Sequence, residues 1–88
     1  MLITRELVRD KLLAYLNHQI TLSDLVDWAE TALCEGDLEE YRAETLRDII
    51  ARIGLADVQK FDLSWTDCSD FLKQLGYEVR VEAVPIGA

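Results

Sequence analysis

The sequence predicts a mainly α-helical domain, with four helices followed by a short C-terminal β-strand. Two observations lead to this fold class. Apolar residues recur at spacings of three and four along most of the chain, which is the period of an amphipathic helix. Between Tyr77 and Ala83 the period changes to two, which is typical of a strand with one buried face.

Length and composition indicate a single domain over residues 1–88. Of these 88 residues, 50% are hydrophobic, which is enough for one modest core. Pro85 is the single proline and there are four glycines, so no linker or low-complexity segment divides the chain.

The first two helices are expected to form an antiparallel hairpin. The first runs from Arg5 to Asn17 behind an N-cap at Thr4. The second is capped by Thr21 or Ser23 and ends at Gly36, a residue that tolerates the left-handed conformation. The short connection between them favours antiparallel packing.

The third helix is expected to begin near Asp37, or later within the acidic segment 37–44, and to end at Gly54. It carries an apolar stripe of Leu46, Ile49, Ile50 and Ile53. Residues 55–63 fit no single period and leave room for a short extended piece.

Ser64 and Asp67 have the spacing of a capping box and predict the start of the fourth helix, which Gly76 closes. We expect Trp65 at its start to be buried. The strand that follows needs hydrogen-bond partners for its backbone. Three are open: the 58–63 region, the same strand of a second copy, or another protein.

The predicted core combines the apolar faces of all four helices. It consists of Leu12, Leu16, Leu25, Val26, Ala29, Leu33, Leu46, Ile49, Ile50, Ile53, Phe71, Leu72 and Leu75.

The net charge of −8 bears on the partners that the chain can bind. It repels nucleic acid and anionic membrane surfaces and favours a basic protein. Cys34 and Cys68 make no disulfide framework, the first residues lack the apolar run of a signal peptide, and no apolar run is long enough for a membrane span. We therefore expect a cytoplasmic protein that binds neither nucleic acid nor membrane.

No motif of catalysis, cofactor binding or metal binding is present in the sequence. There is one histidine, His18, and no pair of cysteines with zinc-ligand spacing. The acids of segment 35–40 lack the alternating spacing of a calcium loop, and no glycine-rich phosphate loop or nucleophile motif occurs. The sequence therefore predicts no enzyme activity, no cofactor and no metal.

The acidic residues are concentrated in one part of the chain. From Asp24 to Asp48 there are nine acidic and two basic residues, a net charge of −7, while the remaining residues are nearly balanced at −1. A concentrated charge of one sign steers a partner of the opposite sign. The predicted partner-binding residues are Asp24, Asp27, Trp28, Glu30, Glu35, Asp37, Glu39, Glu40 and Tyr41.

Trp28 has two interpretations. An aromatic residue ringed by Asp24, Asp27 and Glu35 has the composition of a binding hot spot with a charged rim. Alternatively, it packs on the third helix or on the C-terminal strand, because Trp is usually largely buried.

The stretch Ile20–Glu30, ITLSDLVDWAE, is similar in style to the second-helix entry of the colicin-type bacterial immunity proteins. The chain also resembles these proteins, and small bacterial antitoxins, in size, acidity and helical content. The resemblance implies a protein that covers the cationic groove of a nuclease with carboxylates. The alternative function is a structural or assembly protein that forms a homodimer through its C-terminal strand, since an unpaired strand is a template for pairing between chains.

Overall fold

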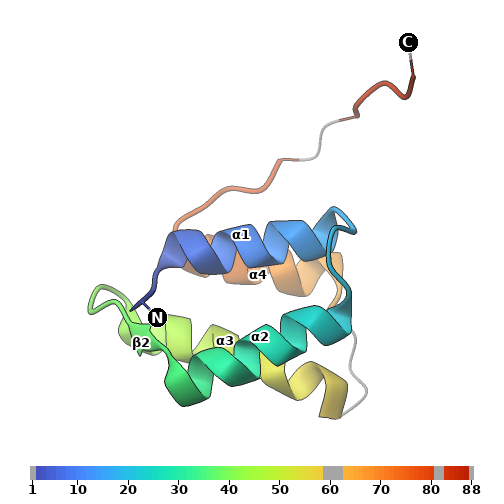
Figure 1. Cartoon of the computed structure of the whole chain (residues 1–88). Coiled ribbons are helices and arrows are strands. Elements are labelled where there is room, and N and C mark those ends of the chain that lie inside the picture. Colours follow the sequence, from blue (N-terminus) through green and yellow to red (C-terminus); the bar gives the residue numbers. More distant parts are fainter. Residues whose placement is uncertain (1, 59–62, 81–82, 88) are drawn as a thin grey trace.

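The computed structural model describes residues 2–58, 63–80 and 83–87 of the chain. These residues form four helices. Figure 1 shows them packed as a bundle, with α2 running beside α3 and α1 beside α4. Their bounds are α1 Arg5–Leu16, α2 Leu22–Glu35, α3 Ala43–Val58 and α4 Trp65–Gln74. A small sheet of β1 (Leu2–Ile3) and β2 (Asp37–Leu38) lies at one end of the bundle. The predicted mainly α-helical class is confirmed.

The starts of α1, α2 and α4 are set by local sequence, as predicted. Thr4 caps α1 through its side-chain oxygen. Thr21 and Asp24 form a complete capping box on α2, and Ser64 and Asp67 form one on α4. In each box the hydroxyl accepts from one exposed amide and the carboxylate accepts from the other, so two unpaired donors are satisfied at once.

Of the two starts expected for the third helix, the one near Asp37 is wrong and the later one within the segment 37–44 is confirmed. Asp37 and Leu38 are extended and pair in parallel with Leu2 and Ile3. The helix begins at Ala43, directly after Arg42, whose φ of 62° is left-handed and cannot belong to a right-handed helix. Pairing between segments far apart in the sequence thus overrides the helical pattern of the acidic segment.

The end of the third helix also differs from the expectation. Gly54 is buried inside α3, which continues to Val58, so the extended piece expected within 55–63 is not found at residues 55–58. The rest of that expectation, and pairing with it, falls largely on residues 59–62, outside the described residues.

Gly36 ends α2 for a reason other than the one predicted. Its backbone is extended (φ −84°, ψ 149°) and not left-handed. A Cβ atom there would lie 2.7 Å from Cγ1 of Ile3 and 2.6 Å from the carbonyl oxygen of Ala32. Glycine is therefore required because β1 packs against the end of α2.

Gly76 closes the last helix in the predicted way. Its φ is +94°, its amide donates to the Lys73 carbonyl oxygen, and the Tyr77 amide donates to the Leu72 carbonyl oxygen at 2.8 Å. This pair of hydrogen bonds is the Schellman motif, which depends on a residue that adopts the left-handed conformation.

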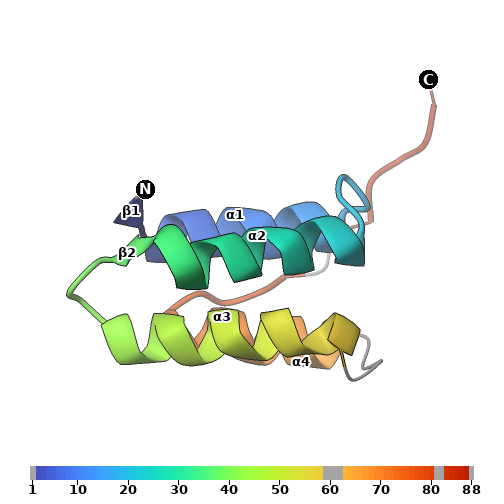
Figure 2. The same ribbon diagram turned by 60° about the horizontal axis from the view of Figure 1, so that its bottom comes forward.

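The predicted C-terminal strand is absent from residues 77–80 and 83–87, while Val81 and Glu82 lie outside the described residues. The alternation itself is present, since Tyr77 and Val79 pack against the core and Glu78 and Arg80 face solvent. Figure 2 shows the tail running along the helical body before it leaves it. Side-chain contacts hold residues 77–80 against the core. Among the described residues, no strand lies beside this segment to form the backbone hydrogen bonds of a sheet.

The core follows the helical stripes with specific exceptions. Leu16 and Phe71 are half-buried and pack against the core. Two predictions are wrong: Leu33 is 45% exposed and Trp65 is 47% exposed. Helical spacing places each on the apolar stripe of its helix, and the fold leaves about half of each side chain exposed. The buried residues that the prediction missed are Ile3, Val8, Ala32, Ala56, Leu63 and Cys68.

Candidate functional site

The acidic segment folds into one region of the molecule, consisting of α2, β2, the following loop and the start of α3. Helices α2 and α3 form the most extensive helix–helix contact. We call the exposed carboxylates of this region the acidic surface: Asp27, Glu30, Glu35, Asp37, Glu40, Glu44 and Asp48. The fold therefore keeps together the charges that the sequence concentrates.

Two of the predicted partner-binding acids have structural roles. The Asp24 carboxylate accepts a hydrogen bond from the Thr21 amide at 3.1 Å and completes the cap of α2. Oε1 of Glu39 accepts one from the Arg5 amide at 2.9 Å, which places a negative charge at the start of α1. A carboxylate there is favoured by the helix dipole. Asp24 and Glu39 therefore stabilise the fold.

The carboxylates of the acidic surface form no ion pair with any residue that the structure describes. The three ion pairs found there lie elsewhere, between Arg5 and Glu6, Arg9 and Asp10, and Arg80 and Glu78. The acidic surface thus presents uncompensated charge to solvent.

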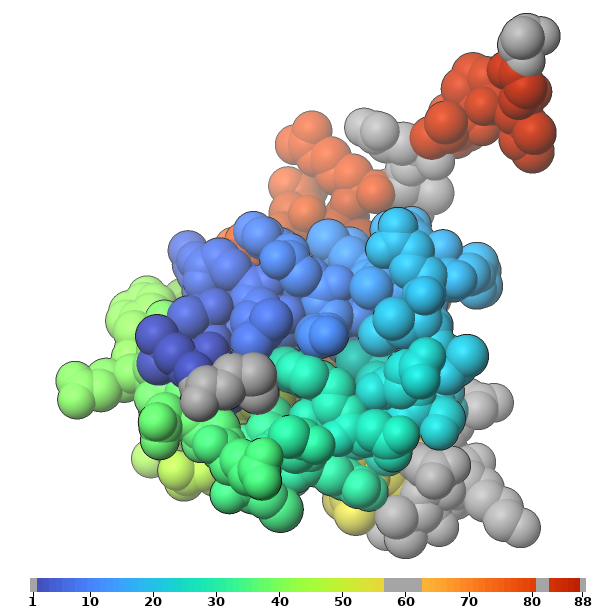
Figure 3. Space-filling model, viewed as in Figure 1, coloured from blue at the N-terminus to red at the C-terminus, as the bar shows by residue number. Residues whose placement is uncertain are grey.

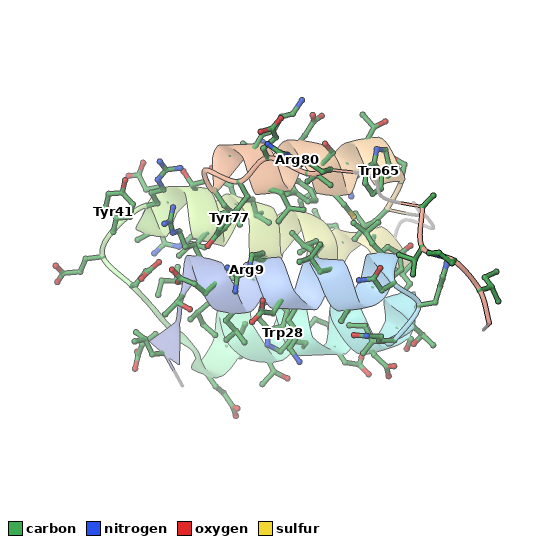
Figure 4. All side chains as sticks on the ribbon, turned by 90° about the horizontal axis from the view of Figure 1, so that it is seen from above. Arg9, Trp28, Tyr41, Trp65, Tyr77 and Arg80 are labelled. Carbon is green, nitrogen blue, oxygen red and sulfur yellow. The ribbon has the colours of Figure 1, made fainter. Side chains whose placement is uncertain are left out.

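Trp28 is half-buried and packs against the core, and Nζ of Lys11 lies 5.8 Å from the centroid of its ring. Figure 4 shows Trp28 between α2 and α1. The interpretation of Trp28 as a largely buried residue therefore fits the structure better than that of a fully exposed anchor, and its contact with Lys11 is made to α1.

Tyr41 is the exposed aromatic residue of the loop before α3, at 63% exposure. The guanidinium of Arg42 lies 5.2 Å from the centroid of its ring. Hydrogen bonding to Arg42, reinforced by its charge, lowers the pKa of the Tyr41 hydroxyl. Tyr41 therefore offers an accessible ring beside the acidic surface.

A groove of about 310 Å³ lies between the end of α2, β2 and the start of α3. We call it the α2–α3 groove. Its charged lining residues are the acidic Asp37 and Glu40 and the basic Arg47. The remaining lining is apolar: Ala32, Leu33, Gly36, Leu38 and Ala43.

Sequence reasoning missed this groove because it treated Leu33 as a core residue. Helical spacing puts Leu33 on the apolar stripe of α2, but the spacing does not tell a stripe centre from a stripe edge. Leu55 on α3 is similarly exposed, at 46%. The groove that Asp37 and Glu40 line therefore contains one accessible large apolar side chain, that of Leu33.

The basic residues near the chain start, unlike the carboxylates of the acidic surface, make contacts with other side chains of the chain. The guanidinium groups of Arg5 and Arg9 lie 5.1 and 5.2 Å from the centroid of the Tyr77 ring. A hydrogen bond and an ion pair with Asp10 raise the pKa of Arg9. These cations hold the tail against α1 through cation–π contacts.

Reactive and metal-binding side chains do not converge in the described residues. Among them, no three side chains of the His, Cys, Asp and Glu types are placed to hold a metal ion. Cys34 is exposed on α2, and burial raises the pKa of the Cys68 thiol to about 11. None of the described helices combines the length and the apolar character of a membrane span.

Comparison with known proteins gave no match to a family model, a curated protein or a solved structure.

Proposed function

We propose that this chain is a non-catalytic protein-interaction module whose acidic surface captures a basic partner protein and thereby neutralises it. One observation carries the proposal: seven exposed carboxylates without ion pairs in the described structure lie on α2, β2, the following loop and the start of α3, and two of them, Asp37 and Glu40, line the α2–α3 groove. The charge raises the rate of association with a partner, and the apolar contact adds to the affinity.

Concentrated negative charge acts on the rate of association. It attracts a cationic surface over a Debye length of about 8 Å at physiological salt and orients it before contact. Carboxylates spaced three or four residues apart, such as Asp27 with Glu30 and Glu44 with Asp48, share a helix face and repel each other. A basic partner removes this repulsion on binding, which favours the complex.

Apolar contact supplies affinity that charge alone does not. Leu33 is exposed on α2, where it lines the groove, and Tyr41 is exposed in the loop before α3. Such residues form the desolvated centre of an interface, with charged residues at its rim. The resemblance to immunity proteins supports the same kind of partner, a protein with a cationic working surface.

Charge reversal tests the proposal. The variant Asp27→Lys with Glu30→Lys changes the charge of the acidic surface and leaves the helix caps intact. We expect it to fold as the wild type does and to lose capture of the basic partner in a pull-down.

The matched control is Asp70→Lys with Glu78→Lys, which makes the same change in net charge on exposed residues elsewhere. It should retain capture. Equal loss in both double variants would show a response to overall charge, and unchanged capture in the first would exclude the acidic surface as the interface.

A second candidate function is self-association through the tail. Beyond the seated segment the chain leaves the body (Figure 3), with Val84 75% exposed and Ile86 101% exposed. Exposed apolar residues on an extended segment favour pairing between chains. Light scattering across a concentration series tests this, since Val84→Asp with Ile86→Asp should abolish any dimer that the wild type forms.

A further inference from the structure

We propose that the α2–α3 groove is an anchor site for one arginine or lysine side chain of the partner. The aliphatic stem of that side chain would lie on Leu33, Leu38 and Ala43, and its cationic end would meet Asp37 and Glu40. This inference rests on the proposed function and names the chemistry by which the acidic surface selects its partner.

The size of the groove fits a single long side chain. At about 310 Å³ it is at the lower end of ligand pockets, which span roughly 300–1,000 Å³. Arginine and lysine place their methylene groups on apolar surface while their charge stays in water. A groove lined by both apolar and charged side chains offers contacts to both ends of such a side chain.

The charged lining residues of the groove favour binding of a cation over an anion. Two carboxylates, from Asp37 and Glu40, stand against the single guanidinium of Arg47. Glu35 and Glu44, which lie close to these residues in the sequence, are exposed and add further negative charge. Within the described structure Arg47 forms no ion pair with these acids. It is therefore a resident cation that competes with an incoming one.

The β2 side of the groove is held in place before binding. Leu38 pairs with Ile3, and the Glu39 amide donates to the Ile3 carbonyl oxygen at 3.0 Å. The Glu39 side chain is fixed in turn by the Arg5 amide. A preformed site binds at a lower entropic cost, because its walls need no ordering when the ligand enters.

A titration followed by NMR of the isotope-labelled full chain tests the proposal. The probe is the peptide acetyl-Ala-Arg-Ala-amide at millimolar concentration, and the controls are the same peptide with Gln or Glu at the centre. The arginine peptide should shift the amides of Leu33, Leu38 and Ala43, while the Gln and Glu peptides should not.

Substitutions of the charged lining residues test whether the groove attracts a cation. Asp37→Asn with Glu40→Gln should weaken binding of the arginine peptide about tenfold, because the two substitutions remove two attractive charges. Arg47→Gln should strengthen it about threefold, the size of one like-charge interaction over several ångströms near the surface. Wild-type-like spectra of each free variant would show that the fold is kept.

Two results would overturn the anchor site, and each is distinct from failure of the proposed function. If the Glu peptide shifts the same amides and Arg47→Gln abolishes that effect, the groove takes an anion. If no peptide shifts these amides while Asp27→Lys with Glu30→Lys still loses the partner, capture depends on surface charge without the groove.

Discussion

Arg42 donates a hydrogen bond from Nη1 to the carbonyl oxygen of Gln74 across 2.6 Å, and so ties the start of α3 to the end of α4. Arg5 donates in the same way to the next carbonyl oxygen, that of Leu75, at 3.1 Å. Carbonyl oxygens in the last turn of a helix have no partner within it, and a cation beside them is favoured by the helix dipole. Two arginines, one from α1 and one from the residue before α3, thus cap α4.

Replacement of Arg42 by Gln should lower the free energy of unfolding by about 1 kcal/mol, because an exposed charged hydrogen bond to the helix end is lost. Urea unfolding measures this. Arg47→Gln is the control, since Arg47 is exposed and forms no described ion pair; it should change stability by less than about 0.5 kcal/mol. Equal effects of the two substitutions would contradict a specific role for Arg42.

The close packing of Gly36 leads to a second prediction. Gly36→Ala should destabilise the fold by about 2 kcal/mol or more, because the new Cβ would overlap with Ile3 and with the Ala32 carbonyl oxygen.

Gly54→Ala is the opposite case. Its Cβ would have 4.0 Å to the nearest atom, Cδ1 of Leu33, and the residue lies inside a helix. Alanine there should be neutral or should stabilise by up to about 1 kcal/mol. Thermal unfolding of both variants checks the pair, and a stable Gly36→Ala variant would show that β1 does not press on α2.

The buried thiol of Cys68 predicts a dependence of stability on pH. Burial, with a smaller contribution from Asp67, raises its pKa from 9.0 to about 11 in the folded chain. Between these values the unfolded chain loses the thiol proton and the folded chain keeps it, so stability falls as pH rises. The loss should approach about 2 kcal/mol near pH 11.

Urea unfolding from pH 8 to pH 10.5 tests this in a Cys34→Ala background. The variant that also carries Cys68→Ala should be less stable at pH 8 but should show a smaller decline with pH. Parallel declines in the two proteins would mean that other groups, and not the Cys68 thiol, cause the loss.

The features that sequence reasoning predicted correctly are those set by local chemistry. Thr4 and the Ser64–Asp67 box act within one turn of the chain, so their spacing is sufficient to identify them. At the second helix the spacing left Thr21 and Ser23 open as caps, and Thr21 is the cap that the structure uses. The helical stripes likewise identified most of the core. Gly76 was predictable because a left-handed helix end strongly favours glycine.

The features that it missed depend on contacts between distant segments. Two-residue strands carry too few side chains for a pattern, so the pairing of Ile3 with Leu38 had no local signal. The same pairing explains Gly36, whose neighbour is Ile3. Leu33 and Trp65 show the limit of periodicity, which identifies a helix face but not the edge at which the covering helix stops.

The candidate site shows the same division. Concentration of the acids between Asp24 and Asp48 was visible in the sequence, and the fold keeps them in one region. The α2–α3 groove was not predictable, because it forms where β2 replaces the expected start of the third helix. The structural use of Glu39 was hidden for the same reason, since its partner is the distant Arg5 amide.

The central claim is that the acidic surface captures a basic protein, and the salt dependence of capture tests it most directly. The tagged chain would be used to recover proteins from lysate of the native host, and the dissociation constant of any recovered protein would be measured at low and moderate salt. Our account predicts one basic protein whose affinity falls steeply as salt rises, because screening weakens exposed charge pairs. Recovery of nothing except the chain itself, or of a partner whose affinity does not change with salt, would contradict it.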